Sequence, residues 1–167
     1  MNIKDLLKSF PRAGRVVWIG LRPERRGPVA VVEQVLASEE EGLLGDHYAG
    51  RRDGPASGKR HVTLIQAEHL PAIGSYLGRD TVDPAELRRN LVVSGLNLLT
   101  LKDTRFRIGK AVLEYTGECH PCTKMEATLG PGGYNAVRGH GGITARVVEG
   151  GEIRLGDAVE VLVDGAY

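Results

Sequence analysis

Both cysteines of the chain lie in one short stretch, Gly117–Met125, which reads Gly-Glu-Cys-His-Pro-Cys-Thr-Lys-Met. Pro121 directly precedes Cys122, and the residues that follow, through Leu129, are typical of a helix that begins here. Proline is tolerated at the first helical position because its missing N–H would be unpaired there anyway. We therefore expect Cys122 at a helix N-terminus, beside Lys124, where positive potential favours the thiolate. A thiolate can serve as a nucleophile or as a soft metal ligand.

The Cys-x-x-Cys spacing is compatible with other chemistry. A structural zinc site needs four ligands, and the five histidines show no local spacing that would complete one: His47, His61, His69, His120 and His140. A thioredoxin-type redox pair of Cys119 and Cys122 would begin a helix in a strand–helix–strand unit, which this sequence does not suggest. Polar neighbours argue against two ordinary buried cysteines. We favour a single reactive Cys122 and keep the redox pair as an open alternative.

Arginines and glycine-rich turns could supply an anion site around this thiol. Arg88, Arg89 and Asn90 precede a predicted strand, and they could equally be a solvated turn. Arginine binds phosphate through a planar fork, and glycine turns let backbone N–H groups approach the same oxygens. Two glycine loops are candidates, 130–134 and 138–142; the second contributes Arg138, His140, Gly141 and Gly142.

The segment 42–60 has little apolar periodicity and contains four basic residues, Arg51, Arg52, Lys59 and Arg60. A stretch of this length without regular structure is uncommon in a compact domain. It is either a mobile surface loop or a lid over an anionic ligand, with Asp46 and His47 as its candidate polar groups. Its glycines do not match a P-loop, because the Gly54–Lys59 spacing is one residue short and Arg60 stands where Ser or Thr is needed.

Short strands separated by turns must position these groups. Apolar and β-branched runs predict strands at 15–21, 29–36, 61–66, 91–93, 104–108, 111–116, 143–148 and 158–163. Short helices are predicted at 4–10, 67–77 and 84–88 and after Cys122. Many strands without regular strand–helix alternation favour a mainly β fold, a closed or nearly closed β-barrel with a few short peripheral helices.

Length and composition limit the protein class. The 167 residues are enough for one domain (residues 1–167, with a core at about 15–163) without disulfide staples. The 22 basic residues nearly balance the 21 acidic ones, which gives no support to nucleic-acid or membrane binding. There is no signal-peptide pattern at the N-terminus and no apolar run long enough to span a bilayer. We expect a cytoplasmic protein.

Six motifs in this order resemble the MOSC domain. They are Gly-Asp-His-Tyr-Ala-Gly (45–50), Arg-His-Val-Thr-Leu-Ile (60–65), Arg-Arg-Asn-Leu-Val-Val-x-Gly (88–95), Gly-Glu-Cys-x-Pro-Cys-x-Lys-Met (117–125), Arg-Gly-His-Gly-Gly-Ile-x-Ala-Arg-Val (138–147) and Gly-Asp-x-Val-Glu-Val (156–161). MOSC domains form the C-terminus of molybdenum-cofactor sulfurases, and they occur in the mitochondrial amidoxime-reducing component and in small stand-alone bacterial proteins. The resemblance extends from Arg15 to Val163.

The resemblance implies a pyruvate-kinase-barrel-like β-barrel that binds molybdenum cofactor (Mo-molybdopterin), with Cys122 ligating the metal. Arg88 and Asn90 match the family's Arg-x-Asn motif, which helps to hold the pterin and its phosphate. The further cofactor-binding candidates are Arg89, Lys124, Arg138, Gly141 and Gly142, and the possible proton donors are Asp46, His47 and His140. Pyridoxal phosphate binding is associated with the family only as a whole.

Two functions follow from the resemblance, and a third from the cysteines alone. The first is a molybdenum-dependent oxidoreductase that reduces a small N-hydroxylated compound. Because the chain lacks iron–sulfur cysteines and a dinucleotide motif, its electrons would come from a separate flavin or iron–sulfur protein. The second is a carrier of molybdenum cofactor, or of sulfur as a Cys122 persulfide. The third is a thiol–disulfide protein that uses Cys119 and Cys122.

Overall fold

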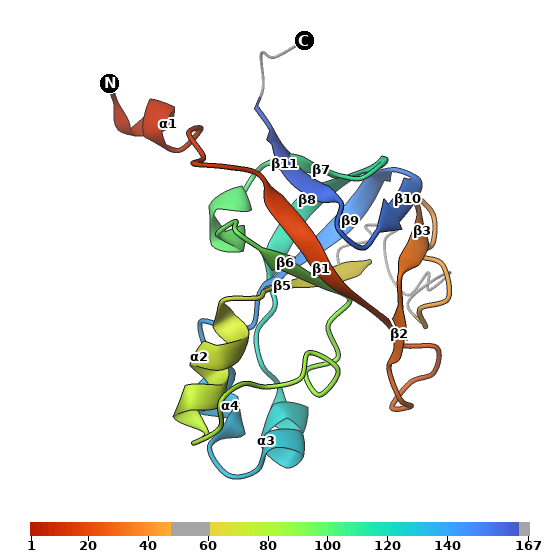
Figure 1. Ribbon diagram of the computed structural model, residues 1–167, viewed down its shortest axis with the longest axis vertical. Coiled ribbons are helices and arrows are strands. Elements are labelled where there is room, and N and C mark those ends of the chain that lie inside the picture. Colours follow the sequence, from red (N-terminus) through yellow and green to blue (C-terminus); the bar gives the residue numbers. More distant parts are fainter. Residues whose placement is uncertain (48–60, 164–167) are drawn as a thin grey trace.

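The computed structural model describes residues 1–47 and 61–163, and within these ranges seven strands close into a barrel (Figure 1). Around the barrel they run β1 (Gly14–Leu21), β6 (Leu91–Ser94), β5 (Val62–Gln66), β9 (Ile143–Glu149), β8 (Ala111–Glu118), β7 (Arg105–Ile108) and β11 (Ala158–Leu162). Pairing of β11 with β1 completes the ring. β5 and β6 are parallel, and the other neighbours are antiparallel. The predicted mainly β barrel is confirmed.

Alternating side chains fill the barrel. In β7, for example, Phe106 and Ile108 are fully buried while Arg105 and Arg107 face outward. Such alternation follows from the two-residue period of a strand, which sends successive side chains to opposite faces. One apolar cluster of residues from all seven barrel strands results, and it forms the main core.

A small second sheet flanks the barrel and corrects two predictions. The run 29–36 is not one strand: it divides at Glu33 into β2 (Ala30–Val32), which pairs with β1, and β3 (Gln34–Ser38). β3 pairs with β4 (Gly42–Leu43) and with β10 (Gly151–Arg154), a strand that the sequence did not predict. The beginning of the predicted 42–60 loop is therefore a strand, whereas residues 48–60 lie outside the described ranges.

Three helices cover one end of the barrel: α2 (His69–Tyr76), α3 (Thr123–Leu129) and α4 (Gly133–Val137). They bury a second apolar cluster against β5 and β6, in which Ile73, Met125 and Val137 meet Ile65 and Val92. A 3₁₀ turn, η1 (Leu98–Leu101), follows β6, and α1 (Ile3–Leu6) lies at the opposite end of the molecule. No helix in the described part of the chain is long and apolar enough to cross a membrane.

Four predictions about the helices require correction. Residues 84–88 form turns, because Arg88 adopts a left-handed conformation (φ 56°) that ends the segment before a helix can develop. The helix predicted at 4–10 covers only Ile3–Leu6. Pro121 is not the first helical residue, since α3 begins at Thr123. Residues 133–137, predicted as loop, form α4.

Candidate functional site

The two thiols lie on the short link between β8 and α3. Cys122 is the N-cap residue of α3, with an extended backbone (φ −128°, ψ 177°), and its side chain caps no backbone N–H. The expected position at a helix start is therefore confirmed. Cys122 is exposed and Cys119 is half-buried, and both are free thiols. An exposed thiol that caps no backbone N–H is available to bind or react.

Arg89 lies under this link and has an unusual environment. It is only 6% exposed. Its Nε donates to the Gly141 carbonyl at 2.9 Å and its Nη1 to the Leu87 carbonyl at 2.6 Å, whereas its buried Nη2 has no partner among the described residues. Burial lowers the pKa of Arg89, and the proximity of Cys119 and Cys122 acts in the opposite direction. A buried cation with an unsatisfied donor is costly, so Nη2 is suited to an anionic ligand.

The glycine loop 138–142 closes this corner by direct backbone contact. The Cys119 N–H donates to the Gly142 carbonyl at 2.9 Å. A Cβ on Gly141 would lie 2.2 Å from the Cys119 carbonyl oxygen and 3.3 Å from Arg89 Nη2. Gly142 has φ +87°, and a Cβ there would lie 1.9 Å from the Leu64 carbonyl oxygen. Only glycine at both positions allows the loop, the cysteine link and Arg89 to lie this close together.

We expect the substitution Gly141→Ala to disturb the site more than the fold. The added methyl group would clash with the Cys119 carbonyl oxygen. Backbone cannot move aside as the end of a flexible side chain can, so the link between β8 and α3 must shift. Gly141 has no positive φ, so the substitution carries no conformational penalty of that kind. Amide exchange or NMR shifts should change at 118–122 and at Arg89. The exposed Gly139→Ala, whose Cβ meets no atom within 4 Å, is the control for the presence of alanine in this loop, although its φ of +79° adds local strain.

His140 extends the site toward α2. Its ring contacts that of His69 edge-to-face, with centroids 4.8 Å apart, and lies 5.6 Å from the ring of Tyr76. The Nδ1 atoms of His69 and His140 are buried, and neither has a hydrogen-bond partner in residues 1–47 and 61–163. Gln66 Nε2 lies 3.3 Å from His69 Nε2. His140, one residue from Gly141, is thus the possible proton donor that adjoins the cysteine–arginine corner.

Stability should fall in mild acid because of the partly buried imidazole of His69. Burial, with the charge of nearby His140 as the second cause, lowers the pKa of His69. As pH falls, His69 takes up its proton more readily in the unfolded chain than in the folded one, which favours unfolding. The contribution of His69 to stability is therefore complete above the ordinary histidine pKa of about 6.5 and decreases as pH falls below it. Burial lowers the pKa of His47 and His61 as well, with the same sign.

The measurement is the free energy of unfolding in urea at a series of pH values. His69→Gln should flatten, but not abolish, the decrease in stability below about pH 6.5, since two other histidines contribute. His120→Gln, at an exposed position, should leave the slope unchanged. A slope that is the same in all three proteins would contradict the assignment to His69.

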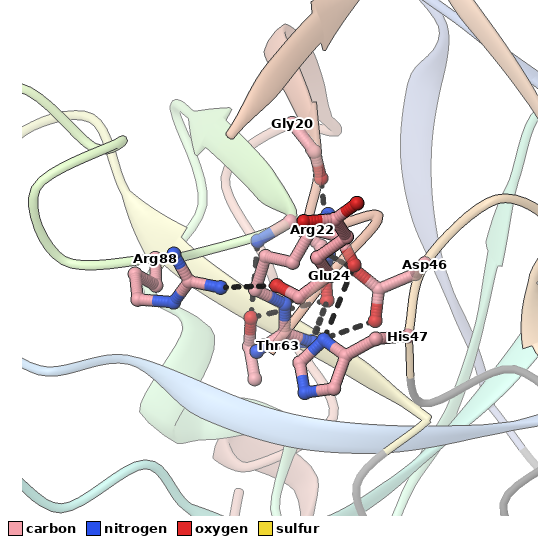
Figure 2. A network of polar contacts seen from close by, with 8 residues as sticks. Gly20, Arg22, Glu24, Asp46, His47, Thr63 and Arg88 are labelled. Carbon is pink, nitrogen blue, oxygen red and sulfur yellow. Dashed lines mark hydrogen bonds and ion pairs between the residues drawn. The ribbon is translucent and has the colours of Figure 1, made fainter. Parts of the chain in front are cut away.

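A separate polar network joins β1 to the segment that leads into β6 (Figure 2). The buried Asp46 carboxylate accepts from Arg22 at three donors, the backbone N–H (2.7 Å), Nε (3.0 Å) and Nη2 (2.9 Å). Asn90, fully buried, donates to Asp46 at 3.2 Å and to the Gly20 carbonyl at 3.0 Å. Its Oδ1 accepts from Arg22 and from the Thr63 backbone and hydroxyl. The network fixes Asn90 and therefore the backbone next to Arg89.

His47 and Arg88 lie at the edge of this network (Figure 2). His47 donates its backbone N–H to the Arg22 carbonyl at 2.6 Å, and its Nδ1 lies 3.2 Å from the same oxygen. Arg88 donates to the carbonyls of Gly27 and Glu24. The side chains of Asn90 and Asp46 are thus occupied by protein partners and have almost no exposed surface.

The predicted site residues therefore divide into two groups. Arg89, His140 and Gly141 gather around the cysteine link, while Asp46, His47, Arg88 and Asn90 surround Arg22. Lys124 and Arg138 are exposed on the surface of α3 and after α4. The basic residues at 51, 52, 59 and 60 lie outside the described ranges. Sequence reasoning missed Arg22 and Thr63, whose roles depend on contacts with residues 24 and 27 positions away.

The donor set suits a cofactor better than a metal ion bound by protein alone. Within residues 1–47 and 61–163, no three His, Cys, Asp or Glu side chains converge as a metal site. One exposed thiol with a buried guanidinium nearby fits a group that brings its own ligands and an anionic portion.

Comparison with known proteins identifies a family. The model of the MOSC domain matches residues 51–160. The crystal structure of YuaD from Bacillus subtilis has a TM-score of 0.77 at 20% identity, covering 90% of this chain and 96% of YuaD. YiiM from Escherichia coli (TM-score 0.68, 18% identity, 92% and 72%) and YiiM from Geobacillus stearothermophilus (0.70, 16%, 92% and 77%) have a similar fold. At these identities the likeness concerns the fold alone.

A curated sequence also matches, over a shorter region. The 2-oxoglutarate dehydrogenase E1 component of Exiguobacterium is 27% identical over 81 residues. These residues are 48% of this chain but only 8% of that protein. The similarity therefore concerns a small part of the longer protein.

Proposed function

Because this chain belongs to the MOSC domain family, we propose that it binds molybdenum cofactor at the corner formed by Cys122, Arg89 and Gly141. We propose further that it reduces N-hydroxylated compounds, with electrons from a separate flavin or iron–sulfur protein. The observation that carries the proposal is the buried Arg89 Nη2, which has no partner in the described part of the chain and lies under the cysteine link.

The residues of this corner fit such a group chemically. Molybdenum in its cofactor supplies two-electron oxygen-atom chemistry, while the protein supplies binding, orientation and electrostatics. The exposed Cys122 sulfur is a soft ligand that caps no backbone N–H of α3. Arg89 offers a charged donor already held in position by the Leu87 and Gly141 carbonyls, so little entropy is lost when an anion binds.

Proton supply falls to His140 in this proposal. Its ring lies between the glycine loop and α2, and its Nδ1 is buried without a described partner. Of the three possible proton donors, Asp46 is engaged by Arg22 and Asn90, and His47 lies against the Arg22 carbonyl. His140 can therefore hold a proton at Nδ1 or Nε2 beside the corner without breaking a bond that the fold requires.

A carrier function is the alternative that one observation favours. Cys122 is exposed at the surface rather than enclosed in a cavity, as a group that passes sulfur or cofactor to a partner protein would be. The chain would then hold molybdenum cofactor, or sulfur as a Cys122 persulfide, without turnover of its own.

The test begins with protein from cells supplied with molybdate, in which molybdenum and pterin are measured per chain. Turnover of a hydroxylamine or amidoxime substrate with an artificial electron donor then separates the reductase from the carrier. Metal bound without turnover, together with transfer to an acceptor protein, would favour the carrier. Neither metal nor pterin in such protein would contradict the reductase and the cofactor carrier, and would leave only the persulfide carrier.

Arg89→Lys should reduce pterin content by about tenfold or more, because lysine keeps the charge but loses the fork that makes charge-assisted bonds in two directions. Arg107→Lys is the matched control, since Arg107 faces outward from β7. Both variants should unfold within a few degrees of the parent. Equal cofactor content in both would remove Arg89 from the site.

A further inference from the structure

The segment before β1 carries an apolar stripe that no residue in the described ranges 1–47 and 61–163 covers. Ile3, Leu6, Leu7 and Phe10 follow the i, i+3, i+4, i+7 spacing of one helix face. Phe10 is half-buried against the main core, but Ile3, Leu6 and Leu7 are 69%, 50% and 67% exposed. Figure 1 shows α1 standing clear of the barrel, at the end opposite α2–α4.

The helix itself is well formed although it is short. Asn2 and Asp5 make a reciprocal capping box, in which each side chain accepts from the other's backbone N–H. Yet no residue of α1 is buried. Isolated helices this short are marginal in water, and helical stability in proteins comes mainly from packing of an apolar face. The stripe is therefore expected to pack against another surface.

A receiving surface lies at the base of the same segment. A cleft of about 490 Å³ opens between Leu7–Phe10 and the barrel, where Thr104, Tyr115 and Val161 line its wall. Its volume is in the range of cavities that hold several apolar groups. The helix points away from the barrel, so α1 does not occupy the cleft of its own chain.

We propose that residues 1–10 form a dimerisation arm, with α1 of each copy packed into this cleft of the other. Arm and cleft adjoin on one chain, so a two-fold axis beside them forms both contacts at once, as a self-complementary interface requires. Four charged residues line the cleft: Arg105 and Glu114 pair with each other, which leaves Asp103 and Lys8, at the base of the arm, to meet Lys4 and Asp5 of the other copy's α1. A stable interface buries about 800 Å² per partner, so we expect both arms to engage together.

A membrane surface is the competing partner for an amphipathic arm. Helices that bind a membrane surface have a strongly charged polar face rich in Lys and Arg. This helix spans Ile3–Leu6, and its polar face carries Asp5 as well as Lys4. The adjoining cleft also has no role in a membrane contact. Both features favour a second copy of the chain.

Sedimentation velocity on the full chain, in the micromolar range, should give a dimer. The double substitution Leu6→Glu and Leu7→Glu should raise the dimer dissociation constant by about a hundredfold or more, because two buried leucines are replaced by charges. Leu155→Glu is the control, since Leu155 is similarly exposed (48%) but lies outside the cleft. It should leave the dimer unchanged.

Three results would overturn the proposal: a wild-type monomer throughout this range, a dimer that persists in the double variant, or equal loss in the control. Binding of the wild type to phosphatidylserine vesicles as a monomer, lost in the double variant, would overturn it in favour of a membrane. If the double variant unfolds, amide exchange over residues 3–10 of the wild type decides. Protection that rises with protein concentration supports the arm, and constant exchange overturns it.

Discussion

Replacing Cys122 with alanine should remove molybdenum and pterin almost completely from protein made in molybdate-supplied cells. We expect a decrease of more than about 100-fold, since loss of a residue that merely supports a metal ligand already costs 10–100-fold in affinity. The fold should be unaffected, because the Cys122 side chain is exposed and caps no backbone N–H of α3. Metal analysis, pterin fluorescence and a thermal melt on the same sample measure the molybdenum content, the pterin content and the stability of the fold.

Cys119→Ala is the matched control on the same link. Cys119 is half-buried, three residues from Cys122, and its backbone N–H is bonded to the Gly142 carbonyl whatever the side chain is. The variant should therefore retain metal and pterin. If Cys119→Ala instead abolished activity, and the parent formed a reversible Cys119–Cys122 disulfide, the thiol–disulfide function would replace the molybdenum proposal.

The same pair of variants also distinguishes the carrier from the reductase. A persulfide on Cys122 would be detected by mass spectrometry as an added sulfur on the peptide containing residues 117–125, and it would disappear in Cys122→Ala. A carrier should show this mass, or transfer of cofactor, without reducing a hydroxylamine. A reductase should lose turnover in Cys122→Ala and keep it in Cys119→Ala.

The barrel was predictable because its strands have strong local patterns. Buried runs such as Val62–Gln66 and alternating ones such as Arg105–Ile108 appear in the sequence with turns between them. β10 was missed because Gly151–Arg154 is short, lies between glycines and becomes a strand only by pairing with β3. The helix predicted at 84–88 does not form because Arg88 has a left-handed backbone conformation, which its residue type does not indicate.

The candidate site was predictable by residue type but not by grouping. The link from Cys119 to Cys122 and the glycine loop are visible as motifs, and Arg89 lies in one as well. What the sequence could not show is which arginine of the Arg88-Arg89 pair turns inward. Arg89 is 6% exposed under the cysteine link, whereas Arg88 bonds the Gly27 and Glu24 carbonyls elsewhere. That difference arises from the backbone turn at Arg88.

The role of Asn90 shows the same limit. The family resemblance implies a contact with the pterin, and this stays an untested prediction. In the structure its side chain has no exposed surface and bonds Gly20, Asp46, Arg22 and Thr63. Such an arrangement fixes the backbone from which Arg89 projects, so Asn90 can affect an anion at the corner without touching it.

Asp46→Ala should be among the most destabilising single substitutions in the described part of the chain, lowering the free energy of unfolding by about 3–5 kcal/mol. Removing one partner of a buried ion pair leaves the other charge uncompensated in a poorly solvated place. Here the stranded group is Arg22, which bonds Asp46 through its backbone N–H, Nε and Nη2. Urea denaturation followed by circular dichroism gives the measurement.

Glu152→Ala is the control, because its pair with Arg154 is at the surface and exposed pairs contribute only about 0–1 kcal/mol. The double variant Arg22→Met, Asp46→Leu should recover part of the loss, since apolar residues of similar volume often replace a buried pair at little cost. Asp46→Ala with stability within about 1 kcal/mol of the parent would contradict the burial of this pair.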